Sequence, residues 1–214
     1  MSSAAVPVIA AGGFAYAGQT CISVQRIIVH EALYDAFREK FAAHVAAKIK
    51  CGDPRDRATV IGPMISADAA GKTRAKIDSA IAAGGRVVFA GPEKGPQIVP
   101  ATVLENVPEH HEACATELFA PVVTLHRVAD AEAALALVND SPFGLQCGIF
   151  TRDLTLAMKA HERLEVGAVL INQTPMFRVE NMPYGGVKDS GFGREGIRYA
   201  MEEMTEPRGL IIRI

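Results

Sequence analysis

The feature that most constrains the fold is an alternation between short runs of β-branched residues and longer segments with helical apolar spacing. Runs rich in Val and Ile predict strands, and the segments of about 10 to 20 residues between them predict helices. Strands joined through helices of that length favour βαβ units, in which neighbouring strands are parallel. We therefore expect an α/β protein with a mainly parallel open sheet and helices on both of its faces.

The elements follow from this pattern and from local signals such as Ser, Asp, Gly and Pro at segment ends. A final apolar run has no turn partner nearby, so residues 1–204 are expected to form one domain and 205–214 a strand at the sheet edge or an arm that reaches a second subunit. The expected strands are 26–30, 86–90, 98–104, 122–128, 147–151 and 168–171, and the expected helices are 4–17, 31–50, 66–83, 130–139, 153–164 and 197–204.

Charge and hydropathy exclude several classes of protein. The 22 Lys and Arg residues, against 24 Asp and Glu, are scattered along the chain and form no basic block, which argues against nucleic-acid binding. The chain has neither an apolar run of about 20 residues nor the pattern of a signal peptide, which predicts no membrane span and a cytoplasmic location. The six His residues lack metal-ligand spacing, so no metal site is expected.

Four cysteines stand far apart, without a CxxC pair, which argues against a zinc site or a disulfide framework. A nucleophilic cysteine needs an exposed position on a loop. Cys21 fits best, because it follows a helix and the nearby Gly18 lets the backbone pass close to a ligand. The alternative is a small buried side chain, which is the better interpretation of Cys51 and Cys147. Acidic neighbours are expected to raise the pKa of Cys114.

The surroundings of Cys21 carry a wider resemblance. Phe14, Gly18, Gln19 and Cys21 occupy the fixed positions of the cysteine motif of the NAD(P)-dependent aldehyde dehydrogenase superfamily, with Tyr16 where that motif has Asn. Further segments resemble the family in the same order along the chain. These segments are GDPRDRATVIGPMI, PATVLENVPE, ELFAPVV, NDSPFGLQCGIFTRD, LEVGAVLIN and MPYGGVKDSGFGREG.

The resemblance covers most of residues 10–214 and implies a cofactor and a set of site residues. In the family a cysteine attacks the aldehyde, hydride passes to NAD or NADP, and water releases the acid from a thioester; Cys21 would be that nucleophile. Glu117 would hold the hydroxyls of the nicotinamide ribose, and Phe119 would pack beside the nicotinamide. The resemblance assigns the Gly-rich loop 183–196 a structural role near the substrate entrance.

Phe177 and Arg178 lie where family members line the aldehyde tunnel. Phe177 would form an aromatic wall, and the Arg178 guanidinium could grip a carboxylate, phosphate or phosphonate. A surface arginine is the alternative. The pattern favours a small anionic or hydroxylated aldehyde as the substrate.

By resemblance, the chain corresponds to the catalytic domain and lacks the N-terminal cofactor domain, the oxyanion Asn and the general-base Glu. We therefore expect the polypeptide alone to be inactive, although the parent protein is an aldehyde dehydrogenase that forms a homodimer or homotetramer. Two alternatives remain open at this point. One is a non-catalytic oligomerising scaffold or binding module, and the other is thioester or ester hydrolysis by Cys21.

Overall fold

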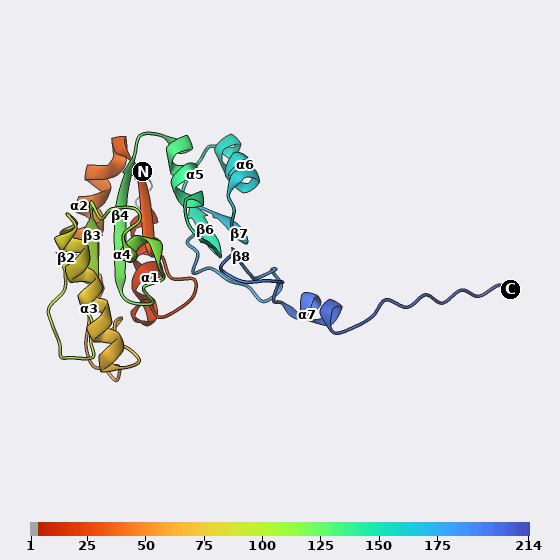
Figure 1. Cartoon of the computed structure of the whole chain (residues 1–214), viewed down its shortest axis with the longest axis horizontal. Coiled ribbons are helices and arrows are strands. Elements are labelled where there is room, and N and C mark those ends of the chain that lie inside the picture. The colour runs from red at the N-terminus through yellow and green to blue at the C-terminus, as the bar shows by residue number, and fades with distance from the viewer. Residues whose placement is uncertain (1–3) are drawn as a thin grey trace.

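The computed structural model describes residues 4–214 and has a four-stranded sheet at its centre (Figure 1). The strand order is β1-β4-β3-β2, and β4 pairs in parallel with both of its neighbours, as the sequence predicts. The edge strand β2 instead runs antiparallel to β3. The connection between β2 and β3 contains no crossover helix, so the chain returns directly. The bounds are β1 Arg26–His30, β2 Arg86–Ala90, β3 Thr102–Glu105 and β4 Val122–Val128.

Helices pack on both faces of this sheet, because successive residues of a strand point to opposite sides. Val103 belongs to an apolar cluster with α1 and α2, whereas the adjacent Leu104 belongs to a cluster with α3 and α4. The four helices therefore form two buried layers, α1 with α2 and α3 with α4, with the sheet between them. The helices are α1 Ala5–Phe14, α2 Glu31–Lys48, α3 Ala67–Ala82 and α4 Glu112–Ala115.

A second group of elements lies beside the sheet (Figure 1). β6 and β7 form a separate parallel pair, and α5 and α6 pack on it through Leu135, Ala160 and Leu164. Asp130 caps α5 by accepting a hydrogen bond from the Ala133 N–H at 2.8 Å, as its acidic N-cap position predicts. The bounds are α5 Ala131–Asn139, β6 Gln146–Ile149, α6 Leu154–Arg163 and β7 Ala168–Ile171.

Several expectations about single elements need correction. The strand expected at 98–104 begins only at Thr102, because Pro100 has no N–H to donate to a ladder. On α2, the helical spacing of Leu33 with Phe37 and Phe41 predicts that Leu33 faces the core, yet it is exposed, and Tyr34 is buried instead. The two-residue strands β5 Phe143–Gly144 and β8 Val187–Lys188 were not expected from the sequence, and they pair antiparallel.

The C-terminal end extends away from the body (Figure 1). After α7, Ile197–Glu203, residues 205–214 are exposed and form no strand, so the expected tail strand has no partner among the described residues of this chain. Within residues 4–214, no helix combines the length and apolar character that a membrane crossing requires.

Candidate active site

The loop that carries Cys21 is shaped by three consecutive residues with left-handed backbone conformation. After α1 the chain forms the short 3-10 turn η1, Ala15–Gly18, with φ of 55° at Tyr16, 56° at Ala17 and 67° at Gly18. A Cβ on Gly18 would collide with the carbonyl of Ala120. Glycine is therefore required both for the conformation and for the close approach, which brings this loop against the segment that contains Glu117 and Phe119.

Hydrogen bonds tie the loop to elements on either side. The Val24 N–H donates to the Gly12 carbonyl at 3.0 Å, which closes the loop on α1. The side-chain oxygen of Gln19 accepts from the Ile65 N–H at 2.8 Å. Gln19 of the cysteine motif thus anchors the long loop 51–65 to the Cys21 loop. This hydrogen bond is a structural reason for a glutamine at this position of the motif.

Cys21 itself is exposed, and its sulfur lies 2.8 Å from the hydroxyl of Tyr184. Tyr184 is only 7% exposed, so its ring is buried while its hydroxyl reaches the thiol. Burial, followed by the hydrogen bond with Cys21, raises the pKa of Tyr184 above its ordinary value. This contact is not visible in the sequence, because Tyr184 lies 163 positions from Cys21 in a loop interpreted as structural.

The other three cysteines are less accessible to a substrate. Burial raises the pKa of all three thiols, and that of Cys147 reaches about 11. For Cys114 the expected direction is right, but the expected cause is wrong: burial dominates, and the acidic contribution comes from Glu109. Of the four thiols, only that of Cys21 is exposed.

Glu117 and Phe119 are held next to the Cys21 loop by Gln25. The Gln25 side chain accepts from the Leu118 N–H at 3.0 Å and donates to the Thr116 carbonyl at 2.7 Å, so it brackets Glu117. Glu117 is exposed, yet partial desolvation raises its pKa. Phe119 is 44% exposed with φ of 50°. Both side chains line a cavity of about 20 Å³ with residues of the Cys21 loop.

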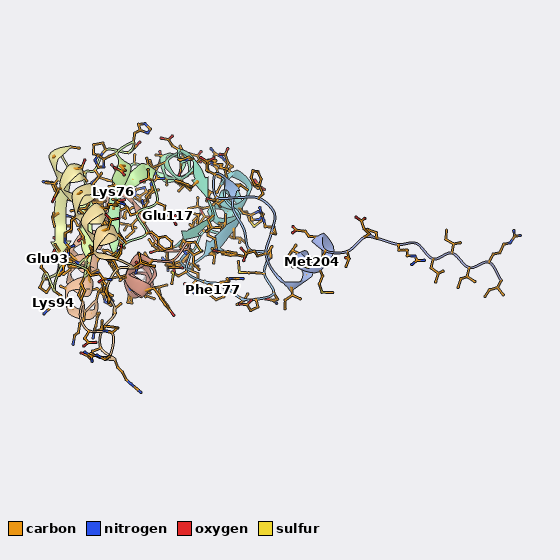
Figure 2. All side chains as sticks on the ribbon, turned by 60° about the horizontal axis from the view of Figure 1, so that its bottom comes forward. Lys76, Glu93, Lys94, Glu117, Phe177 and Met204 are labelled. Carbon is orange, nitrogen blue, oxygen red and sulfur yellow. The ribbon has the colours of Figure 1, made fainter. Side chains whose placement is uncertain are left out.

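Arg178 joins the same group through Tyr184. Its guanidinium carbon lies 4.5 Å from the centre of the Tyr184 ring, a cation–π contact. Carboxylate oxygens of Glu195 and Glu180 lie 3.8 and 3.9 Å from the guanidinium. Phe177, the predicted aromatic wall, is 45% exposed on the side from which α7 and the tail extend (Figure 2).

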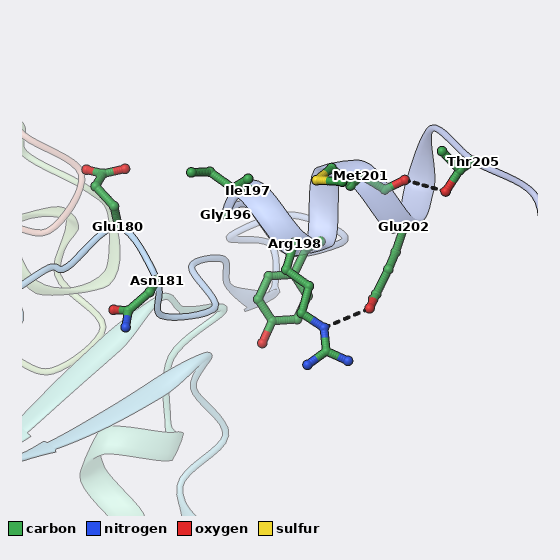
Figure 3. Close-up of a pocket in the computed structure, with 9 residues that line it drawn as sticks. Glu180, Asn181, Gly196, Ile197, Arg198, Met201, Glu202 and Thr205 are labelled. Carbon is green, nitrogen blue, oxygen red and sulfur yellow. Dashed lines mark hydrogen bonds and ion pairs between the residues drawn. The ribbon is translucent and has the colours of Figure 1, made fainter.

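A larger cavity than that of about 20 Å³ lies elsewhere. It measures about 690 Å³ and lies between α7 and the segment that contains Glu180 and Asn181 (Figure 3). Its lining is held by local contacts, such as that between Arg198 and Glu202 at 2.8 Å. Because no cysteine lines it, we place the candidate site at Cys21. In residues 4–214, no cluster of three or more His, Cys, Asp or Glu side chains is arranged to hold a metal ion.

The fold and the thiol loop define the class of protein. A sequence profile described as "Aldehyde dehydrogenase family" matches residues 2–209. The chain belongs to the aldehyde dehydrogenase family.

Individual relatives agree with this assignment. The chain is 41% identical over 210 residues to a 3-sulfolactaldehyde dehydrogenase of Priestia aryabhattai, covering 98% of this chain and 44% of the relative. It is 41% identical over 199 residues to a lactaldehyde dehydrogenase of Methanococcus maripaludis strain C5, covering 93% and 42%. The chain thus spans less than half the length of these relatives.

Solved structures give the same result for the fold. Aldehyde dehydrogenase 21 from Physcomitrella patens, in complex with the reaction product succinate, superposes with a TM-score of 0.92 at 44% identity, over 98% of this chain and 43% of that one. A glyceraldehyde-3-phosphate dehydrogenase from Methanocaldococcus jannaschii complexed with NADP gives 0.88 at 41% identity, over 94% and 43%. The expected α/β fold is confirmed.

Proposed function

We propose that this chain forms the nucleophile-bearing part of an enzyme that oxidises an aldehyde to a carboxylic acid with NAD or NADP, and that Cys21 is the nucleophile. One observation carries the proposal: the exposed sulfur of Cys21 lies on a loop packed directly against the segment with Glu117 and Phe119. Membership of the aldehyde dehydrogenase family supports it.

The chemistry that Cys21 performs follows from its position. As a thiolate it attacks the aldehyde carbon and forms a thiohemiacetal, whose oxyanion the Cys21 N–H can help to stabilise. Loss of hydride leaves a thioester, which water hydrolyses to the acid and the free thiol. An exposed sulfur is required at both stages, because first the substrate and then water must reach the same carbon.

The cofactor would rest on Glu117 and Phe119. A cavity of about 20 Å³ is far too small to enclose a nicotinamide, since it has room for about one water molecule. Both side chains are exposed beside it, however, and a carboxylate and an aromatic ring fit one wall of a nicotinamide riboside site. When bound, NAD or NADP accepts the hydride. Glu117 would hold the ribose hydroxyls, and Phe119 would contact the ring.

We further propose that the substrate is a small aldehyde with an anionic or hydroxyl group. Arg178 supports this proposal, because its guanidinium lies over the ring whose hydroxyl contacts Cys21. Paired N–H donors near a reacting carbon suit a carboxylate, phosphate or sulfonate on the substrate. The names of the relatives, 3-sulfolactaldehyde and lactaldehyde dehydrogenases, point to aldehydes of this kind.

We propose that the 214-residue polypeptide by itself has no useful turnover. Glu117 and Phe119 would contact only one side of the nicotinamide riboside, so the cofactor would not be enclosed. The test joins this chain to the portion of the Priestia 3-sulfolactaldehyde dehydrogenase that it does not cover. Formation of NADH or NADPH from 3-sulfolactaldehyde is then measured for the chimera and for the isolated chain. We expect activity only in the chimera, and we expect Cys21→Ala to reduce it by about a thousandfold or more.

Cys51→Ala is the matched control, because it removes a half-buried thiol from a different loop and should preserve activity. Two results would contradict the proposal: full turnover in the chimera with Cys21→Ala, or normal turnover by the isolated chain. A chimera that folds and oligomerises but never reduces the cofactor would favour the non-catalytic scaffold instead.

A further inference from the structure

We propose that Tyr184 is a positioning residue for the nucleophile: its hydroxyl donates a hydrogen bond to the Cys21 thiolate and fixes the sulfur in one orientation. The observation is the distance of 2.8 Å between the two side chains, which come from opposite ends of the chain. The catalytic consequence rests on the proposed role of Cys21, but the hydrogen bond can be tested without any turnover.

The Tyr184 backbone is anchored on its own loop. Tyr184 and Glu195 exchange two backbone hydrogen bonds, Tyr184 N–H to Glu195 carbonyl at 3.1 Å and Glu195 N–H to Tyr184 carbonyl at 2.5 Å. The Arg194 guanidinium donates to the Gly186 carbonyl at 3.0 Å, which adds a second link between the two ends of this loop. The ring is therefore held by the fold and does not depend on Cys21 for its place.

The same loop is fastened to the body of the protein. The Lys188 ammonium donates to the carbonyls of Asn139, the last residue of α5, and of Ser141, at 2.7 and 3.1 Å. Ser190 accepts a hydrogen bond from the Gly144 N–H at 2.9 Å. A hydroxyl carried by a loop with these anchors can restrict an exposed thiol that would otherwise sample several rotamers.

The charges around the pair determine which partner donates. Two groups besides Cys21 act on Tyr184: Glu195, which raises its pKa, and Arg178, which lowers it. Burial is the largest cause, and the net effect is a pKa well above the ordinary value of tyrosine. Tyr184 therefore stays protonated throughout the range in which a cysteine ionises. Once Cys21 is a thiolate, it can only accept, so the tyrosine is the donor.

Such a bond changes the balance between the two forms of the thiol. Hydrogen bonds to a charged group are stronger than those to a neutral one, so the Tyr184 hydroxyl favours the thiolate over the thiol. In the thiohemiacetal and the thioester the sulfur is uncharged, and the bond weakens. Tyr184 would thus stabilise the sulfur anion at two points: when the Cys21 thiol ionises, and when the thiolate leaves as the thioester is hydrolysed. Tyr184 keeps its own proton throughout.

The test is the rate of Cys21 alkylation by iodoacetamide against pH in the 214-residue chain, followed by mass spectrometry with the other three cysteines as internal references. Tyr184→Phe removes one oxygen atom and keeps the ring under Arg178. We expect the midpoint of the Cys21 profile to move upward by about one pH unit. A merely structural role would alter the limiting rate at high pH through access to the sulfur and would leave the midpoint in place.

Tyr16→Phe is the matched control, since Tyr16 is 81% exposed in the Cys21 loop, and its profile should equal that of the unmodified protein. The ultraviolet absorbance of the thiolate, taken as the difference from Cys21→Ala, measures the same midpoint without alkylation. An unchanged midpoint in Tyr184→Phe by both methods would overturn the proposal even if Cys21 proves to be the catalytic nucleophile. A shifted midpoint supports it even if the chimera with Cys21→Ala remains active.

Discussion

His126 illustrates what burial does to a single ionisable residue. It lies inside β4, where its Nε2 atom is 2.9 Å from the Thr124 hydroxyl and 3.8 Å from the Cys114 sulfur. Burial, with a smaller contribution from the charge of Arg26, lowers its pKa to about 4. His126 is 8% exposed, so its imidazole is part of the packed interior.

The buried histidine predicts a pH dependence of stability. Between about pH 4 and 6.5 the unfolded chain binds a proton at His126 that the folded chain does not, so stability falls as the pH is lowered through this window. The full effect is about 3 kcal/mol. Urea unfolding of His126→Asn should show a weaker pH dependence there than the original protein, whereas His110→Asn, at an exposed position, should not. Equal slopes in all three proteins would contradict this assignment.

Among the site residues, Cys21, Glu117 and Phe119 were singled out because each belongs to a short motif whose order along the chain is visible in the sequence. Gln25 and Tyr184 were missed for a physical reason. Their partners lie about 90 and 163 positions away, and only the folded sheet and loops bring the atoms together. Functional roles for the first three stay predictions, and the chimera tests that of Cys21.

At the scale of elements, local signals were reliable where a strand or helix carries its own pattern. β1, β4 and β7 have the expected bounds, because their β-branched runs are flanked by clear stops. Ser66 caps α3 as expected, accepting from the Ala69 N–H at 3.0 Å. The direction of β2 and the pairing of β5 with β8 depend on contacts between distant segments, which no window of sequence contains.

Lys188, the last residue of β8, gives a prediction about how elements are joined. Lys188 neutralises the carbonyl end of α5 and also pairs with Glu165 at 2.6 Å, so one side chain links α5, the approach to β7 and the Gly-rich loop. Lys188→Met keeps the alkyl chain and removes these bonds. We expect it to lower the free energy of unfolding by about 1.5 to 3 kcal/mol in urea titrations.

The control for this loss is Lys72→Met, since Lys72 forms an exposed pair with Asp68 one turn along α3 and should change stability little. If the two variants unfold at the same urea concentration, Lys188 is not a structural link. Cys21 alkylation in Lys188→Met gives an independent readout, because a loosened loop should carry Tyr184 away from the sulfur and shift the pH profile as Tyr184→Phe does.

At the scale of the whole molecule, the apolar tail 205–214 finds neither burial nor a strand partner within the described residues of the single chain. Leu210, Ile211, Ile212 and Ile214 are all among the exposed large apolar side chains, and residues 205–214 pair with no strand. We propose that the tail adds to a second copy, giving a homodimer or homotetramer.

Light scattering should then show association that increases with concentration and disappears when Ile212 is replaced by Lys. Leu154→Lys, at an exposed apolar site on α6, should associate normally. A monomer at high concentration, or an Ile212→Lys variant that still associates, would locate the subunit contact elsewhere.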